Sequence, residues 1–289
     1  MKEKLTKGKK IFLAVWIGLI AVILALIFII GLPPGEEESI KEVMKDGVLH
    51  ETNKMNFFGI EVNPAVISAY LVTGALLIAA ILIRIFAIPR FKDVPGKFQA
   101  AIEKLVEFFF DMAKGNSPHR TNFIGAYIFS AGVYIFFSTI FELFGVRWAT
   151  VSGHTMALPA PIADINAAIA MGFTTFGMIL AAGIVANGPK GGLRVLKDFS
   201  LPISMSFRLF GALLSGLLVT ELVYYSIYLS FVLPVIVGVL FTLLHAIIQT
   251  YVLATLASVF YGEAVEPPKK KEKKKKQKLK AAEAADLQN

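Results

Sequence analysis

The apolar residues of this chain gather in several long runs instead of alternating with polar residues. A run of about 20 apolar residues is long enough to cross a bilayer as an α-helix. The chain has 289 residues, of which 56% are hydrophobic. The pattern predicts an all-α polytopic membrane protein with about six transmembrane helices. The expected spans are residues 11–32, 64–88, 122–144, 164–187, 200–230 and 231–262.

The first run has two interpretations. It follows five lysines, as in a signal peptide, but it is long for the apolar part of a signal and no A-x-A cleavage site comes after it. We therefore favour a retained anchor helix, or an uncleaved signal-like segment, over a signal peptide. The expected organisation is an N-terminal anchor at 1–32, an external acidic loop at 33–63, a membrane core at 64–262 and a cytoplasmic basic tail at 263–289.

The charges between the runs predict the orientation. Residues 33–63 contain seven acidic and three basic residues, which places this loop outside. Cytoplasmic loops of membrane proteins carry an excess of Lys and Arg. The basic loops flank the second span, separate the fourth from the fifth, and follow the sixth, so both termini are expected in the cytoplasm. The basic residues of the first two loops are Arg84, Arg90, Lys92, Lys97, Lys190, Arg194 and Lys197.

The net charge of +8 does not indicate a nucleic-acid partner, because nine basic residues lie in the tail between Lys269 and Lys280. Such a run is typical of a solvated cytoplasmic tail that touches anionic lipid headgroups. The chain has no cysteine and only four scattered histidines, so neither a metal site nor a cofactor is expected.

Two further helical features stand out. Residues 98–114 place Phe98, Ile102, Leu105, Val106 and Phe109 at helical spacing, which predicts an amphipathic helix at the membrane interface. The last two spans hold about 30 residues each, about 45 Å of helix against a core of about 30 Å. We therefore expect a long, steeply tilted C-terminal hairpin, with Pro202 and Pro234 near the starts of its arms.

Arg208 is the first functional candidate. It lies in an apolar segment with no second charge from there to Thr220. A cation in such a segment costs from about 2.5 to well over 10 kcal/mol, so it requires an interior partner or a water-filled path. Gly211, Ala212 and Ser215 share its helix face. This face of small residues either packs against another helix of the same chain or, as we favour, docks a partner that brings a carboxylate.

Other polar groups form candidate walls of a path. Thr242, His245 and Gln249 make one stripe in the sixth span, which either wets a path or bonds to the facing helix. Glu142, Asp164, Asn166 and Glu221 would extend such a path outward, although Asp164 is equally well placed to cap a helix. Ser204 and Ser206 precede Arg208 and would line a cytoplasmic opening. Arg208 would separate two half-paths.

At these residues the sequence resembles subunit a of the bacterial F-type ATP synthase. The shared motifs cover about residues 64–262 in the family's order. They are Val94-Pro95-Gly96-Lys97-Phe98-Gln99, Ala163-Asp164-Ile165-Asn166, Phe207-Arg208-Leu209-Phe210-Gly211, and Gln249 followed by an aromatic-rich last helix.

The resemblance implies a multi-pass stator subunit of the bacterial inner membrane, without catalytic chemistry of its own. It implies a ring of c subunits, each with one membrane carboxylate, as partner, together with the b subunit of the peripheral stalk and other ATP synthase subunits. Arg208 matches the family's essential arginine and Gln249 the glutamine opposite it. The arginine would pair with each passing carboxylate and couple H⁺ or Na⁺ flow to rotation.

This sequence departs from the family at three polar positions. Ala212 stands where Asn is common, Leu217 where an acid or His is common, and Thr242 where His or Glu is common. We hypothesise that His245 and Glu221 replace the polar side chains that are missing at Leu217 and Thr242. A competing interpretation is a secondary transporter with Arg208 as the site for an anionic substrate, but the inverted repeat that this class favours is not visible.

Overall fold

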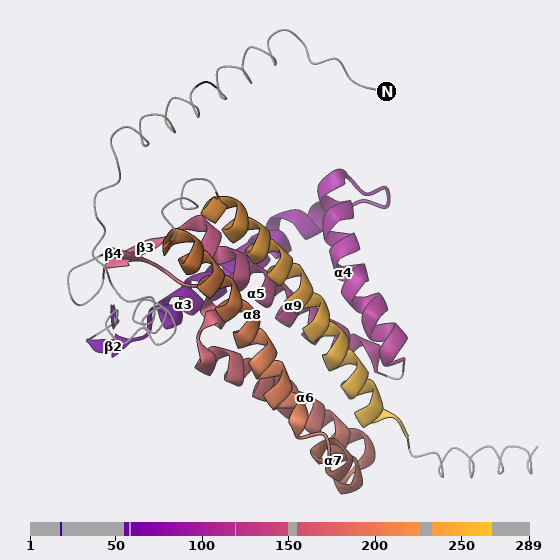
Figure 1. Ribbon diagram of the computed structural model, residues 1–289. Helices are drawn as coiled ribbons and strands as arrows, with labels where there is room; N and C mark the ends of the chain where they lie inside the picture. Colours follow the sequence, from indigo (N-terminus) through magenta and orange to yellow (C-terminus); the bar gives the residue numbers. More distant parts are fainter. Residues whose placement is uncertain are drawn as a thin grey trace, which may run out of the picture. The chain divides into compact units, whose positions relative to one another are not determined.

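The computed structural model describes residues 18, 55–57, 59–118, 120–149, 155–225 and 233–267. The chain divides into two compact units, residues 1–39 and 40–289, and every helix and strand with a label in Figure 1 belongs to the second unit. The expected anchor at 11–32, apart from Gly18, lies outside the described residues. So do most of the acidic loop and most of the lysine tail.

The described chain is mainly helical (Figure 1). Its α-helices are α3 (Pro64–Leu82), α4 (Lys97–Asn116), α5 (Thr121–Ile140), α6 (Ile165–Asn187), α7 (Pro189–Leu196), α8 (Ser200–Tyr225) and α9 (Leu233–Val265). Short helical turns are η1 (Ile83–Ala87), η2 (Ile88–Arg90), η3 (Phe141–Phe144) and η4 (Pro161–Ala163). Two small antiparallel hairpins pair β1 (Met55–Phe57) with β2 (Ile60–Val62) and β3 (Arg147–Ala149) with β4 (Thr155–Ala157).

Four helical segments of the described chain are long and apolar enough to cross a membrane. They are Pro64–Arg90, Thr121–Phe144, Ile165–Asn187 and Gly238–Val265. A fifth span results if α7 and the first part of α8, which meet at 48°, count as one bent span. A polytopic helical membrane protein is therefore confirmed. Of the six expected spans, four match these segments, the one at 200–230 corresponds to the bent pair, and the one at 11–32 lies outside the described residues.

Four helices, α5, α6, α8 and α9, form the packed centre of the second unit. Gly172 of α6 faces the Pro202 carbonyl and the Ser206 hydroxyl of α8, so a side chain there would collide with α8. Gly132 of α5 faces Phe109 of α4 and Thr250 of α9 in the same way. Small residues let membrane helices approach closely, and these two positions hold α6 on α8 and α5 between α4 and α9.

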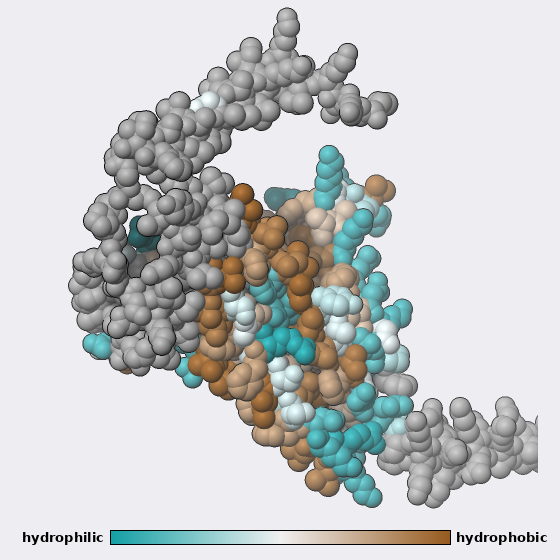
Figure 2. Space-filling view, viewed as in Figure 1, coloured by the Kyte–Doolittle hydropathy of each residue, from teal (hydrophilic) through white to brown (hydrophobic). Residues whose placement is uncertain are grey.

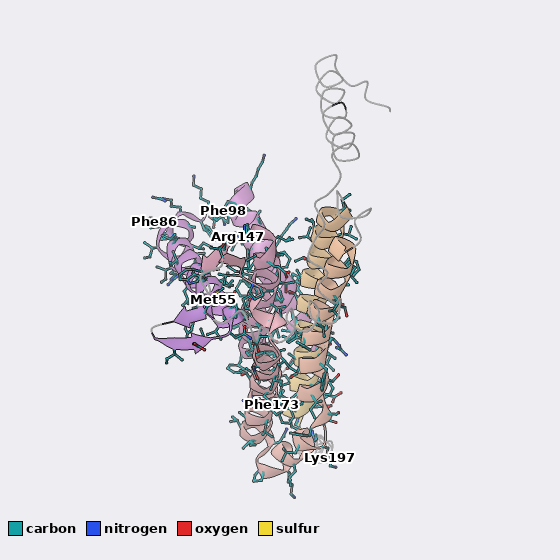
Figure 3. All side chains as sticks on the ribbon, turned by 60° about the vertical axis from the view of Figure 1, so that its left-hand side comes forward. Met55, Phe86, Phe98, Arg147, Phe173 and Lys197 are labelled. Atoms are coloured by element: carbon teal, nitrogen blue, oxygen red, sulfur yellow. The ribbon has the colours of Figure 1, made fainter. Side chains whose placement is uncertain are left out.

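Helix α3 lies apart from this centre along most of its length. Only 6% of its most apolar stretch is buried, and in Figure 1 it runs behind α8 and α9. Its first turns are attached through a small cluster of Met55, Ile67 and Leu158. The turn η1, which follows α3, and the start of α4 meet, since Phe86 and Phe98 line one cavity and lie at the same end in Figure 3.

Helix α4 confirms the amphipathic helix expected at residues 98–114. Phe109 and Ala113 are buried in the cluster shared with α5, α6 and α9, whereas Phe98 and Leu105 are exposed. The apolar stripe is thus only partly covered by protein. Its placement at the membrane interface stays a prediction.

The C-terminal hairpin has the expected long arms, with 26 residues in α8 and 33 in α9. Pro202 is the third residue of α8 and Pro234 the second residue of α9, both in the first turn, where a helix tolerates proline. At about 1.5 Å per residue, α9 is about 50 Å long, longer than a bilayer core of about 30 Å. A steep tilt remains the prediction that would reconcile these lengths.

Candidate functional site

Helix α8 has two different faces, and Arg208 lies on the open one. Leu201, Met205 and Leu209 are buried. Leu209 packs in a cluster with Ile162 of η4 and with residues of α5, α6 and α9. The arginine is the residue before Leu209 and its side chain is exposed. The buried face therefore fixes the direction in which the guanidinium points.

The surroundings of Arg208 are apolar. Among the described residues no carboxylate lies within ion-pair distance of it. The neighbouring helix α9 exposes Leu240, Leu244 and Ile247. Figure 2 shows a hydrophilic area surrounded by hydrophobic surface where α8 and α9 lie. A guanidinium is not deprotonated in proteins, so this face of the described chain carries a permanent positive charge.

Small residues continue the Arg208 face toward the end of α8. A Cβ at Gly211 would meet no atom within 4 Å. Ser215 is exposed, and its hydroxyl donates to the Gly211 carbonyl at 2.7 Å, so its hydrogen bond is satisfied within its own helix. Ala212 is half-buried. No described helix packs onto Gly211, in contrast to Gly172, which the chain uses for its own packing.

The polar stripe of α9 faces α8. Gln249 is buried, and its side-chain amide donates to the Arg208 backbone carbonyl at 3.1 Å. The Nδ1 of His245 lies 4.0 Å from a Cβ at Gly216 and 2.8 Å from the Phe241 carbonyl, to which it donates when that nitrogen is protonated. Thr242 is half-buried. Of the two interpretations of the stripe, a bond to the facing helix is observed at Gln249.

The two serines before Arg208 differ in position. Ser204 is exposed. Ser206 is buried, its hydroxyl donates to the Pro202 carbonyl at 2.7 Å, and it lies against Gly172 of α6. The close approach of α6 covers this face of α8, and the cytoplasmic opening expected at Ser206 stays a prediction.

At the start of α6, Asp164 joins the starts of two helices. Its Oδ1 accepts from the backbone N–H groups of Asn166 at 2.6 Å and Ala167 at 3.4 Å, which makes it the N-cap of α6. Its Oδ2 accepts from Nδ2 of Asn63 at 2.6 Å, and Asn63 caps α3. Sequence reasoning missed Asn63, although an asparagine before Pro64 at the start of an apolar run is a recognisable cap signal.

A cavity of about 410 Å³ opens beside this bridge, between α3 and α6. Asp164 and Asn166 line it, together with Asn63, Tyr70 and Thr73. The structure thus gathers two of the expected outer residues at one polar cavity and adds three that the sequence pattern did not indicate.

The remaining candidates lie elsewhere. Glu142 is exposed in η3 and takes part in an interaction there. Glu221 lies on α8, but its side chain is outside the described part of the structure. Among the described residues no group of three His, Asp or Glu side chains could hold a metal ion.

One comparison with known proteins covers most of this site. The family model described as "ATP synthase A chain" matches residues 68–262, more than half of the chain. The match begins within α3 and ends near the end of α9, so it includes Arg208, Asp164 and the α9 stripe, whereas Asn63 precedes it.

Proposed function

The chain belongs to the ATP synthase A chain family, and from this premise we propose that it is the stator subunit whose Arg208 couples H⁺ or Na⁺ flow to rotation of a ring of c subunits. Family membership makes it an ion-translocating membrane subunit of ATP synthase. The role of the arginine, the two half-paths and the individual partners belong to the proposal.

The observation that carries the proposal is the exposed guanidinium on a small-residue face. A ring subunit with a membrane carboxylate fits this face, since Gly211 and Ser215 let a helix approach and Arg208 supplies the opposite charge. Pairing stabilises the ionised carboxylate and releases its H⁺ or Na⁺. When the carboxylate moves on, it reloads from the other side. The subunit performs no covalent chemistry itself.

Arg208 also separates the two half-paths. A fixed cation repels a cation that would hop directly from one half-path to the other. Gln249 supports this position, because its amide holds the Arg208 backbone carbonyl at 3.1 Å. On the cytoplasmic side Ser204 is the exposed candidate. On the outer side we propose His245, Thr242 and Glu221, with Asp164, Asn166 and Glu142 as the farther polar groups.

The proposed setting is the bacterial inner membrane, with both termini in the cytoplasm. The basic residues after α3 and after α6 support this orientation. The proposed partners are the c ring, the b subunit of the peripheral stalk, other ATP synthase subunits and membrane lipid.

The test is ATP synthesis driven by an imposed ion gradient in vesicles that contain the purified complex. Arg208→Ala should abolish synthesis while the complex stays assembled, because the side chain is exposed and packs no core. Arg208→Lys should also fail, since an ammonium is a point charge without the planar fork of donors. Arg147→Ala, an exposed arginine in β3, is the matched control and should retain synthesis. Near-normal synthesis in both Arg208 variants would refute the stator role.

A further inference from the structure

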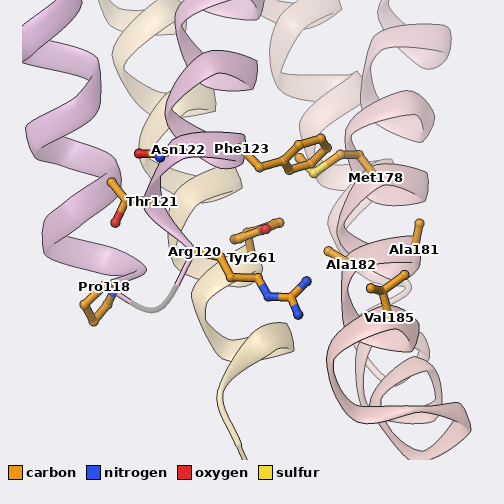
Figure 4. A pocket seen from close by; sticks show the side chains of 10 residues that line it. All are labelled: Pro118, Arg120, Thr121, Asn122, Phe123, Met178, Ala181, Ala182, Val185 and Tyr261. Atoms are coloured by element: carbon orange, nitrogen blue, oxygen red, sulfur yellow. The ribbon is translucent and has the colours of Figure 1, made fainter.

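A further cavity, of about 740 Å³, is lined by residues outside α8, the helix that carries Arg208 (Figure 4). It lies between the start of α5, the second half of α6 and the end of α9. Its wall on α6 is entirely apolar and consists of Met178, Ala181, Ala182 and Val185. On the α5 side Phe123 continues this wall.

Arg120 is the charged group of this cavity. It is exposed and has no hydrogen bond or ion pair among the described residues. In Figure 4 its side chain extends from the start of α5 toward Ala182 and Val185 of α6. Tyr261 of α9 is 1% exposed and its ring stacks on Phe123 with centroids 6.1 Å apart, so the floor beneath the arginine is held by packing.

The order of these groups matches the depth of a membrane leaflet. Arg120 directly precedes the candidate span Thr121–Phe144. Val185 lies near the end of the span Ile165–Asn187, and Met178 lies farther inside it. The helix from Met178 to the end of this span is about 13 Å long. The cation thus lies at headgroup depth and the apolar wall reaches into the depth of the acyl chains.

We propose that this cavity binds one anionic phospholipid, with its phosphate on Arg120 and an acyl chain along the apolar wall of α6. A transmembrane helix of another subunit would cover the apolar wall but leave the guanidinium without an anion. Anionic headgroups are drawn to basic pockets between transmembrane helices on the cytoplasmic side.

Arg194, near the end of α7, does not compete for this role. Arg194 donates to the Glu263 and Glu266 carbonyls at the end of α9, at 3.4 and 3.3 Å, and is therefore engaged in closing that helix. Asn187 donates to the Ala264 carbonyl at 2.9 Å and reinforces the same contact. Of these two arginines, Arg120 is the one that remains available to a phosphate. The proposal does not depend on the role of Arg208.

The first experiment measures lipid retained by the intact complex. The complex is equilibrated in vesicles of phosphatidylcholine with about one fifth phosphatidylglycerol, purified again, and its bound lipids are quantified by mass spectrometry. Arg120→Gln should lower the bound ratio of phosphatidylglycerol to phosphatidylcholine about fivefold, corresponding to about 1 kcal/mol. Arg84→Gln, an exposed arginine in η1 outside the cavity, should leave this ratio unchanged. Equal ratios in Arg120→Gln and the parent would overturn the proposal.

The second experiment tests the apolar wall and identifies the occupant. Ala181 is exposed and lines the cavity, so Ala181→Phe should displace the acyl chain without disturbing the core. Ala80→Phe on the exposed face of α3 is the matched control. A photoreactive residue at 181 should cross-link to phosphatidylglycerol in the parent and much less in Arg120→Gln. Cross-linking to another polypeptide would show that a subunit helix occupies the cavity, and the lipid site would be wrong.

Discussion

At the scale of single residues, the two carboxylate oxygens of Asp164 accept hydrogen bonds from different helices. Oδ1 caps α6, and Oδ2 accepts from Asn63, which itself caps α3. The carboxylate therefore fixes the starts of two helices relative to each other. It also lines the cavity between them, where it could serve an ion path.

Removing this carboxylate should weaken the fold. We expect Asp164→Ala to lower the free energy of unfolding by about 1–2 kcal/mol, since N-cap loss has this magnitude and the Asn63 bond is lost as well. The measurement is thermal unfolding of the subunit in the purified complex. Asp164→Asn is the comparison, because its side-chain oxygen still caps α6 while the acceptor for Asn63 is lost, and it should unfold between Asp164→Ala and the parent. An unchanged transition in Asp164→Ala would show that neither bond contributes.

At the scale of elements, α8 carries small residues on two faces, one buried and one open. Its buried face, with Ser206, receives Gly172 of α6. Its open face, with Gly211 and Ser215, meets no described helix. Two glycines in adjacent helices thus have opposite expected roles, one inside the chain and one toward a partner.

These two glycines form a matched pair of variants. Gly172→Leu should separate α6 from α8 and prevent accumulation of the assembled complex, because its side chain would meet the α8 backbone at the Pro202 carbonyl. Gly211→Leu should leave the chain folded but abolish rotation by blocking the ring, and Ser215→Phe should behave likewise. Subunit composition and coupled ATP synthesis distinguish the outcomes. If both open-face variants keep full rotation, this face does not contact the ring.

At the scale of the whole molecule, two separate polar regions compete for the outer half-path. One is the cavity between α3 and α6 with Asn166. The other is the α9 stripe, where His245 faces Gly216 of α8 and Gln249 reaches Arg208. The stripe leads directly to the arginine, which is the reason for our proposal that the ion passes His245.

Passive ion flux through the reconstituted complex tests the two routes. His245→Leu should reduce flux severalfold, and Glu221→Gln should reduce it as well, because both change polar groups on the proposed route. His154→Leu, in the loop expected between the third and fourth spans, is the control and should not change flux. Unchanged flux in His245→Leu together with a loss in Asn166→Leu would place the route in the cavity between α3 and α6.

The sequence by itself determined the helical membrane architecture, the bounds of most spans and the candidacy of Arg208. These features are local, since the length of an apolar run, a proline in a first turn and a charge in an apolar segment are each visible within a few turns of chain. The amphipathic helix at residues 98–114 was predictable for the same reason.

Only the tertiary structure decided which face of each helix is covered. Gly172 buries Ser206 while Gly211 stays open, and no local pattern distinguishes these two small-residue positions. The same holds for the Asn63–Asp164 bridge and for the cavity at Arg120, whose walls come from segments far apart in sequence. Contacts of this kind depend on how distant helices pack, so they arise only when the whole bundle is assembled.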